Sequence, residues 1–304
     1  MALSSWMLRA DDPQPEEKSV LVDGHRMHCL ITGSGPSLLL LHGLLGSADA
    51  WSPSFSRLGQ ASTLYAVDAL GIGRSERVSG LDASLKAQAD RTAAFMMRAG
   101  IEHADILGTS HGGAVALMLA AHYPELVRSL VLHAPANPFS TISDPLLHFY
   151  CSSLGRWFAY QIPHLPEKLQ ELALGRMHGN SKLVCREALS RYMNSLRVPG
   201  TVQHVLNILH GWFDDMRELE NALTSLHDFP VLLLWGTRDR AVSIESGRLL
   251  EKMLNHAEMV VLPGVGHLPY EESPAAFADA VNHFLHRIDR DETRPGPQLV
   301  RHGS

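Results

Sequence analysis

Gly108-Thr109-Ser110-His111-Gly112-Gly113 occupies residues 108–113 and is the sharpest structural signal in the chain. It fits the pattern G-x-S-x-G, follows the apolar run Ala104–Leu107 and precedes the helical run Ala114–Ala121. Glycine two residues on either side of the serine lets a strand and a helix approach without a clash. The pattern predicts that Ser110 stands exposed at the carboxyl edge of a sheet, where a helix N-terminus favours developing negative charge.

Strand and helix patterns alternate on both sides of this turn. Runs that are apolar on both faces are typical of parallel strands covered by helices. The runs are Ser37–Leu41, Leu64–Val67, Ala104–Leu107, Leu130–Leu132, Val231–Trp235 and Met259–Leu262. The helical patterns are Ser84–Arg98, His111–His122, Ile244–Leu254 and Pro274–Ile288. The alternation predicts an α/β fold with a mostly parallel central sheet flanked by helices. Asp23-Gly24 predicts a hairpin between Val20–Val22 and Met27–Thr32.

The alternation stops between residues 139 and 226. This stretch has several amphipathic helical patterns, many aromatic side chains and no clear strand. We interpret 139–226 as a helical cap or lid inserted into a core formed by residues 18–138 and 227–288. Residues 1–17 form an N-terminal extension and residues 289–304 a flexible tail, because both ends are polar and contain proline.

Composition excludes several classes of partner. The 304 residues are 45% hydrophobic and 19% charged, with a net charge of −6. No run of Lys or Arg stands out, so neither nucleic acid nor an anionic membrane is an expected partner. No apolar segment is long enough for stable membrane insertion. Three widely spaced cysteines are interpreted as buried thiols in a reducing compartment, and we expect a cytoplasmic protein.

Cofactors and metals are not indicated either. The eighteen histidines form no H-E-x-x-H pattern and no cluster with Cys, Asp or Glu at ligand spacing, so no metal is expected. His283 and His286 share one face of a late helix and are interpreted as solvent-facing. Neither G-x-G-x-x-G nor a P-loop occurs, so no nucleotide cofactor is expected. The sequence gives no prediction of the oligomeric state.

Together with the Ser110 turn, four further segments resemble the α/β-hydrolase superfamily over roughly residues 19–288. Their order along the chain is the order that this superfamily shows. The segments are Leu41–Gly46, which resembles the His-Gly loop that supplies an oxyanion-hole amide; Asp68–Ser75, which resembles the D-x-x-G-x-G-x-S turn; Trp235–Asp239, which resembles the turn with the catalytic acid; and Gly264–Pro269, which resembles the loop with the catalytic histidine.

The resemblance implies a role for each of five residues. A serine hydroxyl is a weak nucleophile until a base takes its proton, so Ser110 would be the nucleophile and His267 the base. Asp239 would accept a hydrogen bond from the other ring nitrogen and stabilise the imidazolium. The backbone amides of Leu44 and His111 would bind the oxyanion of the tetrahedral intermediate.

Other interpretations of the acid and the base remain open. In one alternative, Asp239 caps the helix that begins near Ser243 and has no catalytic role. Some relatives place the acid after the preceding core strand, where this chain has Asn137, which carries no charge. His267 could be a loop histidine with satisfied hydrogen bonds and no catalytic role.

Residues that contact the substrate are harder to predict. We select His42 and Gly43 from the predicted oxyanion loop and Trp157 and Trp212 from the aromatic-rich cap. For His42 we favour the interpretation of a structural residue that orients this loop over a direct role in the chemistry, and we interpret Asp68 as a residue that ties down its own turn. Cap aromatics belong more often to the core than to a substrate site.

The resulting hypothesis is a serine hydrolase of the carboxylesterase or lipase type. It would cleave carboxylic esters of small-to-medium apolar substrates through an acyl-enzyme. A serine nucleophile argues against epoxide hydrolases and haloalkane dehalogenases, which use aspartate. Carbon–carbon bond hydrolysis of meta-cleavage products, or lactone or amide hydrolysis, remains the alternative. Meta-cleavage hydrolases commonly carry Trp where this chain has Leu268. A third hypothesis is a ligand-binding relative without catalysis.

Overall fold

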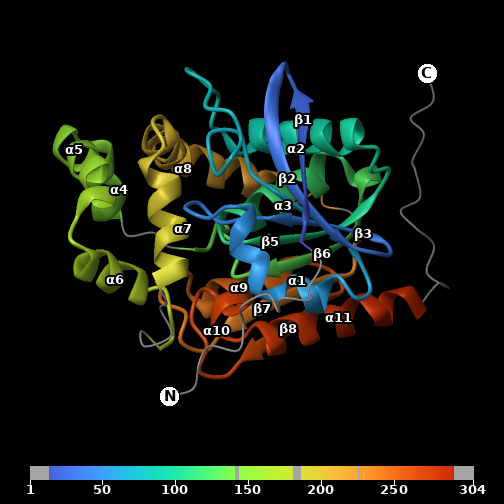
Figure 1. Cartoon of the computed structure of the whole chain (residues 1–304). Helices are drawn as coiled ribbons and strands as arrows, with labels where there is room; N and C mark the ends of the chain where they lie inside the picture. Colours follow the sequence, from blue (N-terminus) through green and yellow to red (C-terminus); the bar gives the residue numbers. More distant parts are fainter. Residues whose placement is uncertain (1–13, 141–143, 181–185, 225, 227, 291–304) are drawn as a thin grey trace.

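The computed structural model describes residues 14–140, 144–180, 186–224, 226 and 228–290. Eight strands form one sheet in the order β1-β2-β4-β3-β5-β6-β7-β8, in which the pairs from β4 to β8 are parallel (Figure 1). The six predicted runs lie within β3 to β8. The strands are β1 Glu16–Val22, β2 His25–Gly33, β3 Ser37–Leu41, β4 Thr63–Val67, β5 Ala104–Thr109, β6 Val127–His133, β7 Val231–Gly236 and β8 Ala257–Leu262.

The antiparallel part of the sheet begins with the hairpin of β1 and β2. Asp23 and Gly24 between these strands have φ angles of 51° and 81°. Two successive positive φ angles are what a two-residue type I′ turn requires, and Asp-Gly supplies them. The predicted hairpin is therefore present, and its pairing extends to Glu16 opposite Ile31.

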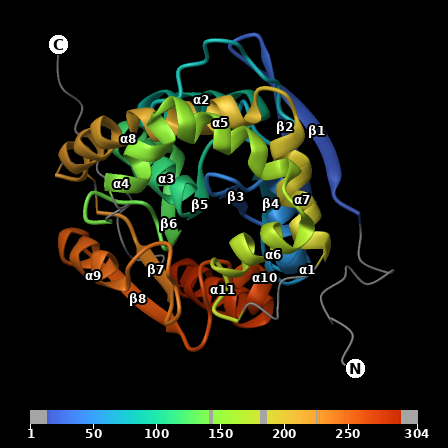
Figure 2. The same cartoon turned by 90° about the vertical axis from the view of Figure 1, so that its left-hand side faces the viewer.

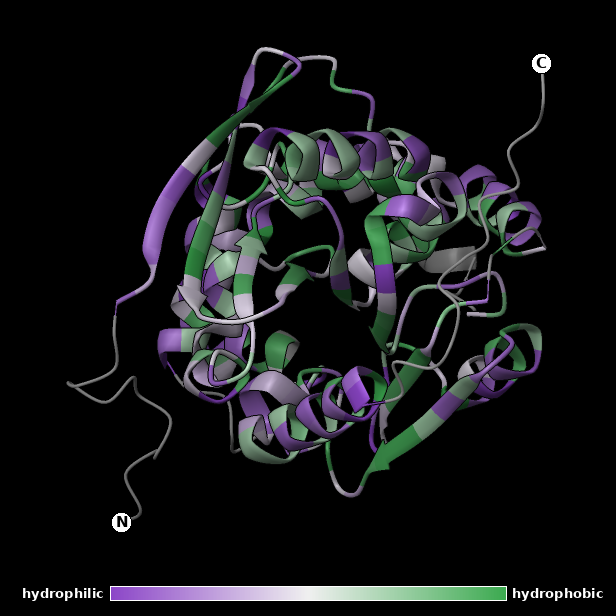
Figure 3. Cartoon of the chain, turned by 90° about the vertical axis from the view of Figure 1, so that its right-hand side faces the viewer, coloured by the Kyte–Doolittle hydropathy of each residue, from purple (hydrophilic) through white to green (hydrophobic). Residues whose placement is uncertain are grey.

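Helices cover both faces of the sheet. Buried residues of α2 and α3 pack on one face, and those of α1 and α11 pack on the other (Figure 1). In Figure 3 most residues of the inner strands are coloured as apolar, whereas the helices around them contain both polar and apolar residues. The bounds of the flanking helices are α1 Ser52–Leu58, α2 Leu85–Ala99, α3 His111–His122, α9 Ile244–Met253, α10 Pro269–Glu272 and α11 Pro274–Arg290.

The described residues between β6 and β7 contain helices and no strand. These helices stand together beside the sheet (Figures 1 and 2). They are α4 Asp144–Cys151, α5 Ser153–Gln161, α6 Glu167–Gly175, α7 Arg186–Arg197 and α8 Thr201–Leu223. The second half of α8, from Trp212 to Leu223, is part of the same apolar cluster as α2 and α3. Helix α8 therefore belongs to the inserted segment at its start and to the core at its end.

The cysteines and the chain ends differ in part from expectation. Cys29 is buried as predicted, but Cys151 is exposed, because it ends helix α4 on the outside of the inserted segment. Cys185 lies outside the described residues. Strand β1 begins at Glu16 and helix α11 continues to Arg290, and most of the predicted extension and tail lies beyond the described residues. None of the described helices is long and apolar enough to cross a membrane.

Candidate active site

The turn around Ser110 joins β5 directly to α3. Ser110 has φ 52° and ψ −120°, a backbone conformation that residues with a side chain rarely adopt. A Cβ atom on Gly108 would lie 2.5 Å from the carbonyl oxygen of Gly112 and 2.7 Å from the Cα of Gly113. The strand and the helix thus pass too closely for any side chain at position 108, as the G-x-S-x-G pattern predicts.

Hydrogen bonds to the neighbouring strand fix this turn. The Ser110 amide donates to the carbonyl oxygen of His133 at 3.0 Å, and the Ser110 carbonyl accepts from the Ala136 amide at 2.9 Å. His133 ends β6, so both bonds tie the serine to the strand beside its own. The unfavourable φ angle of Ser110 is held by these contacts on both sides of the residue.

Asp239 and His267 form a buried hydrogen-bonded pair after β7 and β8. His267 Nδ1 lies 2.7 Å from Asp239 Oδ2, and the two side chains are 3% and 1% exposed. Burial alone would raise the pKa of the Asp239 carboxyl, but the adjacent His267 ring, its hydrogen bond and the Val242 amide lower it overall. The anion holds the proton of His267 on Nδ1 and leaves Nε2 free to act as a base.

Asp239 also shapes its own loop. Its other carboxylate oxygen, Oδ1, accepts from the amides of Ala241 at 2.8 Å and Val242 at 3.0 Å. Helix α9 is capped by Ser243, whose hydroxyl accepts from the Glu245 amide at 3.2 Å. The capping role considered for Asp239 is therefore filled by a residue of the helix terminus itself. Asn137, at the alternative position, donates to backbone and to Ser246.

Parallel strands gather Ser110, Asp239 and His267 at one edge of the sheet. Strands β5 to β8 are consecutive neighbours, and each of the three residues follows the carboxyl end of one of them. Asp239 and His267 are in contact, whereas no hydrogen bond joins Ser110 Oγ to His267 among the described residues. Bonds between a nucleophile and its base are often long before substrate binds.

The predicted oxyanion amides lie beside Ser110. A Cβ atom on Gly43 would be 3.3 Å from Ser110 Cβ and 3.9 Å from Ser110 Oγ, so this loop lies directly against the serine. A Cβ on Gly112 would be 2.3 Å from the Leu41 carbonyl oxygen, which packs the start of α3 against the same loop. The amides of Leu44 and His111 have no hydrogen-bond partner within the described part of the chain. Both are free to bind an incoming oxygen atom.

Asp68 connects the 41–46 loop to the turn that follows β4. Its Oδ1 accepts from the Ala48 amide at 2.7 Å, and its Oδ2 accepts from the Arg74 amide at 2.9 Å. The ring of His28 lies 2.8 Å from Oδ2. Burial would raise the pKa of this carboxyl, but these hydrogen bonds and the nearby His42 lower it. The prediction that Asp68 ties down its turn agrees with these contacts.

His42 uses both ring nitrogens on the backbone. Nδ1 lies 2.8 Å from the Gly43 carbonyl oxygen, and Nε2 accepts from the Ala69 amide at 3.2 Å. Burial lowers the pKa of the ring, which is therefore neutral. His42 holds the 41–46 loop in place, and it also borders the cavity described below together with Gly43.

The two tryptophans selected from the cap have different environments. Trp157 on α5 is 60% exposed, whereas Trp212 on α8 is buried. The centroid of the Trp212 ring lies 6.2 Å from that of the His111 ring. Trp212 is thus close to the Ser110 turn, whereas Trp157 does not border the cavity beside that turn. Substrate contact by either residue stays a prediction.

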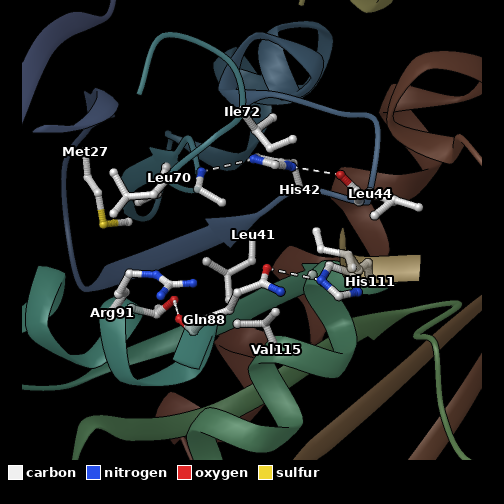
Figure 4. A pocket seen from close by; sticks show the side chains of 16 residues that line it. Met27, Leu41, His42, Leu44, Leu70, Ile72, Gln88, Arg91, His111 and Val115 are labelled. Carbon is white, nitrogen blue, oxygen red and sulfur yellow. Dashed lines mark hydrogen bonds between the residues drawn. The ribbon is translucent and has the colours of Figure 1, made fainter. Parts of the chain in front are cut away.

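A cavity lies behind the 41–46 loop, between that loop and helices α2 and α3. The volume of the cavity is about 40 Å³, which is enough for about three water molecules. Figure 4 shows Leu44 and His111 at one end and Met27 and Arg91 at the other. The wall is largely apolar, and its polar members include Gln88, Arg91 and His111.

His111 is held at the cavity wall as a neutral ring. Its Nε2 lies 3.1 Å from Gln88 Oε1, which can only accept, so the ring proton is on Nε2. Burial, with a further contribution from His42 and His204, lowers the pKa of His111 to about 3. The side chain therefore adds no charge next to the predicted oxyanion site.

Sequence reasoning missed a second histidine beside the predicted base. The centroid of the His133 ring lies 5.7 Å from that of His267, and its Nδ1 lies 2.8 Å from Thr109 Oγ1. Burial, and then the charge of His267, lowers the pKa of His133 to about 3, so the His133 ring is neutral at neutral pH. The only signal in the sequence is a histidine at the end of an apolar run.

The inserted segment is bonded directly to the loop that carries His267. The His267 amide donates to the Met177 carbonyl oxygen at 2.7 Å. The Glu272 carboxylate accepts from the Gly179 amide at 2.8 Å through one oxygen and from the Gly266 amide at 2.9 Å through the other. Nothing in the sequence around Glu272 indicates this contact.

The family follows from a match to most of the chain. The model of the alpha/beta hydrolase fold family matches residues 36–274. The chain belongs to this family. An uncharacterized protein of Mycobacterium tuberculosis is 28% identical to this α/β-hydrolase over 286 residues, which cover 90% of this chain and 81% of the relative. The predicted fold class is thus confirmed by both the sheet and the family.

Named relatives include two kinds of hydrolase. A 2-hydroxymuconate semialdehyde hydrolase of Pseudomonas sp. is 27% identical over 93% of this α/β-hydrolase and 98% of its own length. Lipase 3 of Moraxella sp. is 25% identical over 83% and 76%. Among solved structures, a membrane phospholipase A described as a bacterial virulence factor is 28% identical, with a TM-score of 0.76 and coverage of 91% and 87%. An epoxide hydrolase at 21% identity and a TM-score of 0.77 shares the fold.

Proposed function

We propose that this α/β-hydrolase is a serine hydrolase that cleaves carboxylic esters of small-to-medium apolar substrates through an acyl-enzyme. The observation that carries the proposal is the buried Asp239–His267 pair at the sheet edge where Ser110 stands in its strained turn. A base with its tautomer fixed by an anion, near a half-buried serine, is the arrangement that activates a hydroxyl. Similarity to a lipase supports the ester bond as the target.

In the proposed reaction, Ser110 Oγ attacks the carbonyl carbon while His267 Nε2 takes the hydroxyl proton. The amides of Leu44 and His111 bind the resulting oxyanion, and Asp239 stabilises the imidazolium. His267 then gives its proton to the leaving oxygen, which departs as the alcohol. A water molecule, deprotonated by His267, attacks the acyl-enzyme and releases the carboxylic acid and the free serine.

Substitution of the nucleophile tests the proposal. We expect Ser110→Ala to lower turnover of p-nitrophenyl esters by at least about ten-thousand-fold. A fluorophosphonate should label the wild-type protein on Ser110, as read by mass spectrometry of peptides. Ser34→Ala, on an exposed loop, is the matched control and should keep wild-type turnover and labelling. Activity retained in Ser110→Ala would show the mechanism to be wrong, and absence of labelling would favour a binding protein.

Carbon–carbon bond hydrolysis is the second candidate, because the 2-hydroxymuconate semialdehyde hydrolase matches nearly from end to end. A substrate panel separates the two activities. It contains p-nitrophenyl esters of rising acyl length and a ring-fission product of catechol, compared by kcat/KM. We expect the esters to be turned over faster. Faster turnover of the ring-fission product than of any ester would replace the esterase proposal with the carbon–carbon one.

A further inference from the structure

Arg91 is a buried cation at the inner end of the cavity. The residue is 9% exposed, and its Nη2 donates to the carbonyl oxygen of Asp82 at 2.8 Å. Among the described residues no carboxylate forms an ion pair with it, and Nε and Nη1 have no hydrogen-bond partner. By contrast, the less buried Arg128 pairs with the carboxylates of Asp105 and Asp289.

The electrostatic environment leaves this charge largely uncompensated. Burial lowers the pKa of Arg91, and the carboxylates of Asp82, Asp23 and Asp90 act on it only from beyond contact distance. His204 on α8 is affected in turn, because burial and then the charge of Arg91 lower its pKa to about 4. Taking a guanidinium out of water is unfavourable unless an anion or hydrogen bonds compensate the lost hydration. Its unused donors point to an anionic occupant.

The position of the cavity decides which part of a substrate enters it. Gly43 and Leu44 of the oxyanion loop and His111 border the cavity, whereas neither the Asp239 loop nor the His267 loop does. A leaving alcohol must face His267 to receive its proton. The cavity therefore extends from the oxyanion site on the acyl side of the ester. Figure 4 shows the Arg91 guanidinium extending from α2 toward Leu41, beneath Leu70.

We propose that Arg91 binds a carboxylate at the far end of the acyl group, so that the preferred substrates are monoesters of short dicarboxylic acids. The apolar side chains Leu41, Leu70 and Val115 in the cavity wall would contact the methylene groups of such a chain. The volume of the cavity suits the end of such an acyl chain, namely its carboxylate with one adjacent methylene. This inference deepens the proposed ester hydrolysis and rests on it for the direction in which the substrate lies.

Matched esters test the selectivity. The substrates are monoethyl succinate, monoethyl glutarate and monoethyl adipate. Each is compared with the neutral ester in which an amide replaces the free carboxylate, and hydrolysis is followed by the release of ethanol. We expect the best of the acids to have a kcat/KM at least about tenfold above that of its amide, because a hydrogen bond between charged groups is stronger than a neutral one. A wild-type ratio near one would overturn the inference directly, whatever the variants do.

Variants assign the preference to one side chain. Arg91→Met should bring the ratio of acid to amide close to one, and Arg91→Lys, which keeps the charge, should retain part of it. Arg98→Met is the control, because Arg98 is on the same helix but exposed. It should keep the wild-type ratio. An acid preference that survives in Arg91→Met, or that Arg98→Met lowers equally, would show that Arg91 is not its source.

A binding measurement separates this inference from the proposed function. Ser110→Ala protein is titrated with monoethyl glutarate in a calorimeter, and so are Ser110→Ala/Arg91→Met and Ser110→Ala/Arg98→Met. We expect at least tenfold weaker binding only when Arg91 is replaced. Equal affinities in all three proteins would overturn the inference. If Ser110 is not labelled and no ester is hydrolysed, the proposed function fails, while the titration still decides whether Arg91 holds the anion.

Discussion

Asp239 uses its two carboxylate oxygens for two different tasks. One oxygen accepts from His267, and the other accepts from the amides of Ala241 and Val242. In Asp239→Asn the carbonyl oxygen stays on the two amides, because only it can accept, and the NH₂ group faces His267 Nδ1. The ring then carries its proton on Nε2 and cannot act as a base. We expect kcat for a p-nitrophenyl ester to fall about ten-thousand-fold.

The fold should survive this substitution, since both amide bonds are kept. Thermal unfolding followed by circular dichroism checks that point, and fluorophosphonate labelling should slow in parallel with kcat. If Asp239→Asn kept about a tenth or more of the wild-type kcat, Asp239 would be only a loop residue. The assignment of the acid would then have to be reconsidered.

Single residues were predictable where a local motif contains them. Ser110 lies between glycines that the turn requires, and Asp239 and His267 follow short apolar runs in the order of the resemblance. Arg91 and His133 have no such motif. The burial of both side chains, and the absence of a carboxylate partner for Arg91 among the described residues, arise only when α2, α3 and β6 pack together. A sequence shows which side chains can be charged, but it does not show which of these side chains become buried and lose their hydration on folding.

At the scale of elements, every strand from β3 to β8 contains a predicted apolar run. For the inner strands the reason is that a strand buried on both faces needs continuous apolar sequence, whereas β8 has an apolar run although it is an edge strand and only partly buried. Strand order was not predictable in the same way. Strand β4 lies between β2 and β3, antiparallel to the first and parallel to the second. Such pairings join segments that are distant in the sequence, and the hydrophobic pattern of a strand does not indicate which other strand it pairs with.

The contact between the inserted segment and the His267 loop can be tested by changing Glu272, which bonds to both. In Glu272→Gln only one side-chain oxygen remains to accept, so the Gly179 or the Gly266 amide loses its acceptor. We expect the free energy of unfolding to fall by about 1–3 kcal/mol and kcat to fall about tenfold, because the loop of the base is less firmly held. Chemical denaturation and ester kinetics measure the two effects.

The neighbouring carboxylate provides the control. Glu271 accepts from the Tyr192 hydroxyl of α7 at 3.0 Å and pairs with Arg191, but it bonds to no amide of the 264–267 loop. Glu271→Gln should therefore affect stability with a much smaller loss of kcat. An equal fall of kcat in both variants, or a loss of stability without any loss of kcat in Glu272→Gln, would contradict the expected link between Glu272 and the base.

At the scale of the whole molecule, helix α8 unites the inserted segment with the core. Its residues Trp212, Met216 and Leu219 are buried in the cluster beneath α2 and α3. Asp215 on the same helix accepts from the Leu85 amide at 3.0 Å, at the first residue of α2. The sequence predicted a helical insertion between core strands, but the periodicity of α8 does not tell which half of the helix packs on which unit.

This junction makes stability depend on pH. Burial raises the pKa of Asp215 from 3.8 to about 6, so its contribution to stability is present below about pH 4 and is lost as the pH rises through 6. Asp215→Asn keeps the acceptor for Leu85 and never ionises. We expect it to stabilise the protein by about 2 kcal/mol at pH 8 and by almost nothing at pH 4, as measured by urea unfolding at both values. Asp214→Asn removes an exposed charge that contributes little to the raised pKa of Asp215, so it should show a much smaller dependence on pH. Equal effects of Asp215→Asn at the two pH values would mean that Asp215 ionises freely and that the α2–α8 junction is open to water.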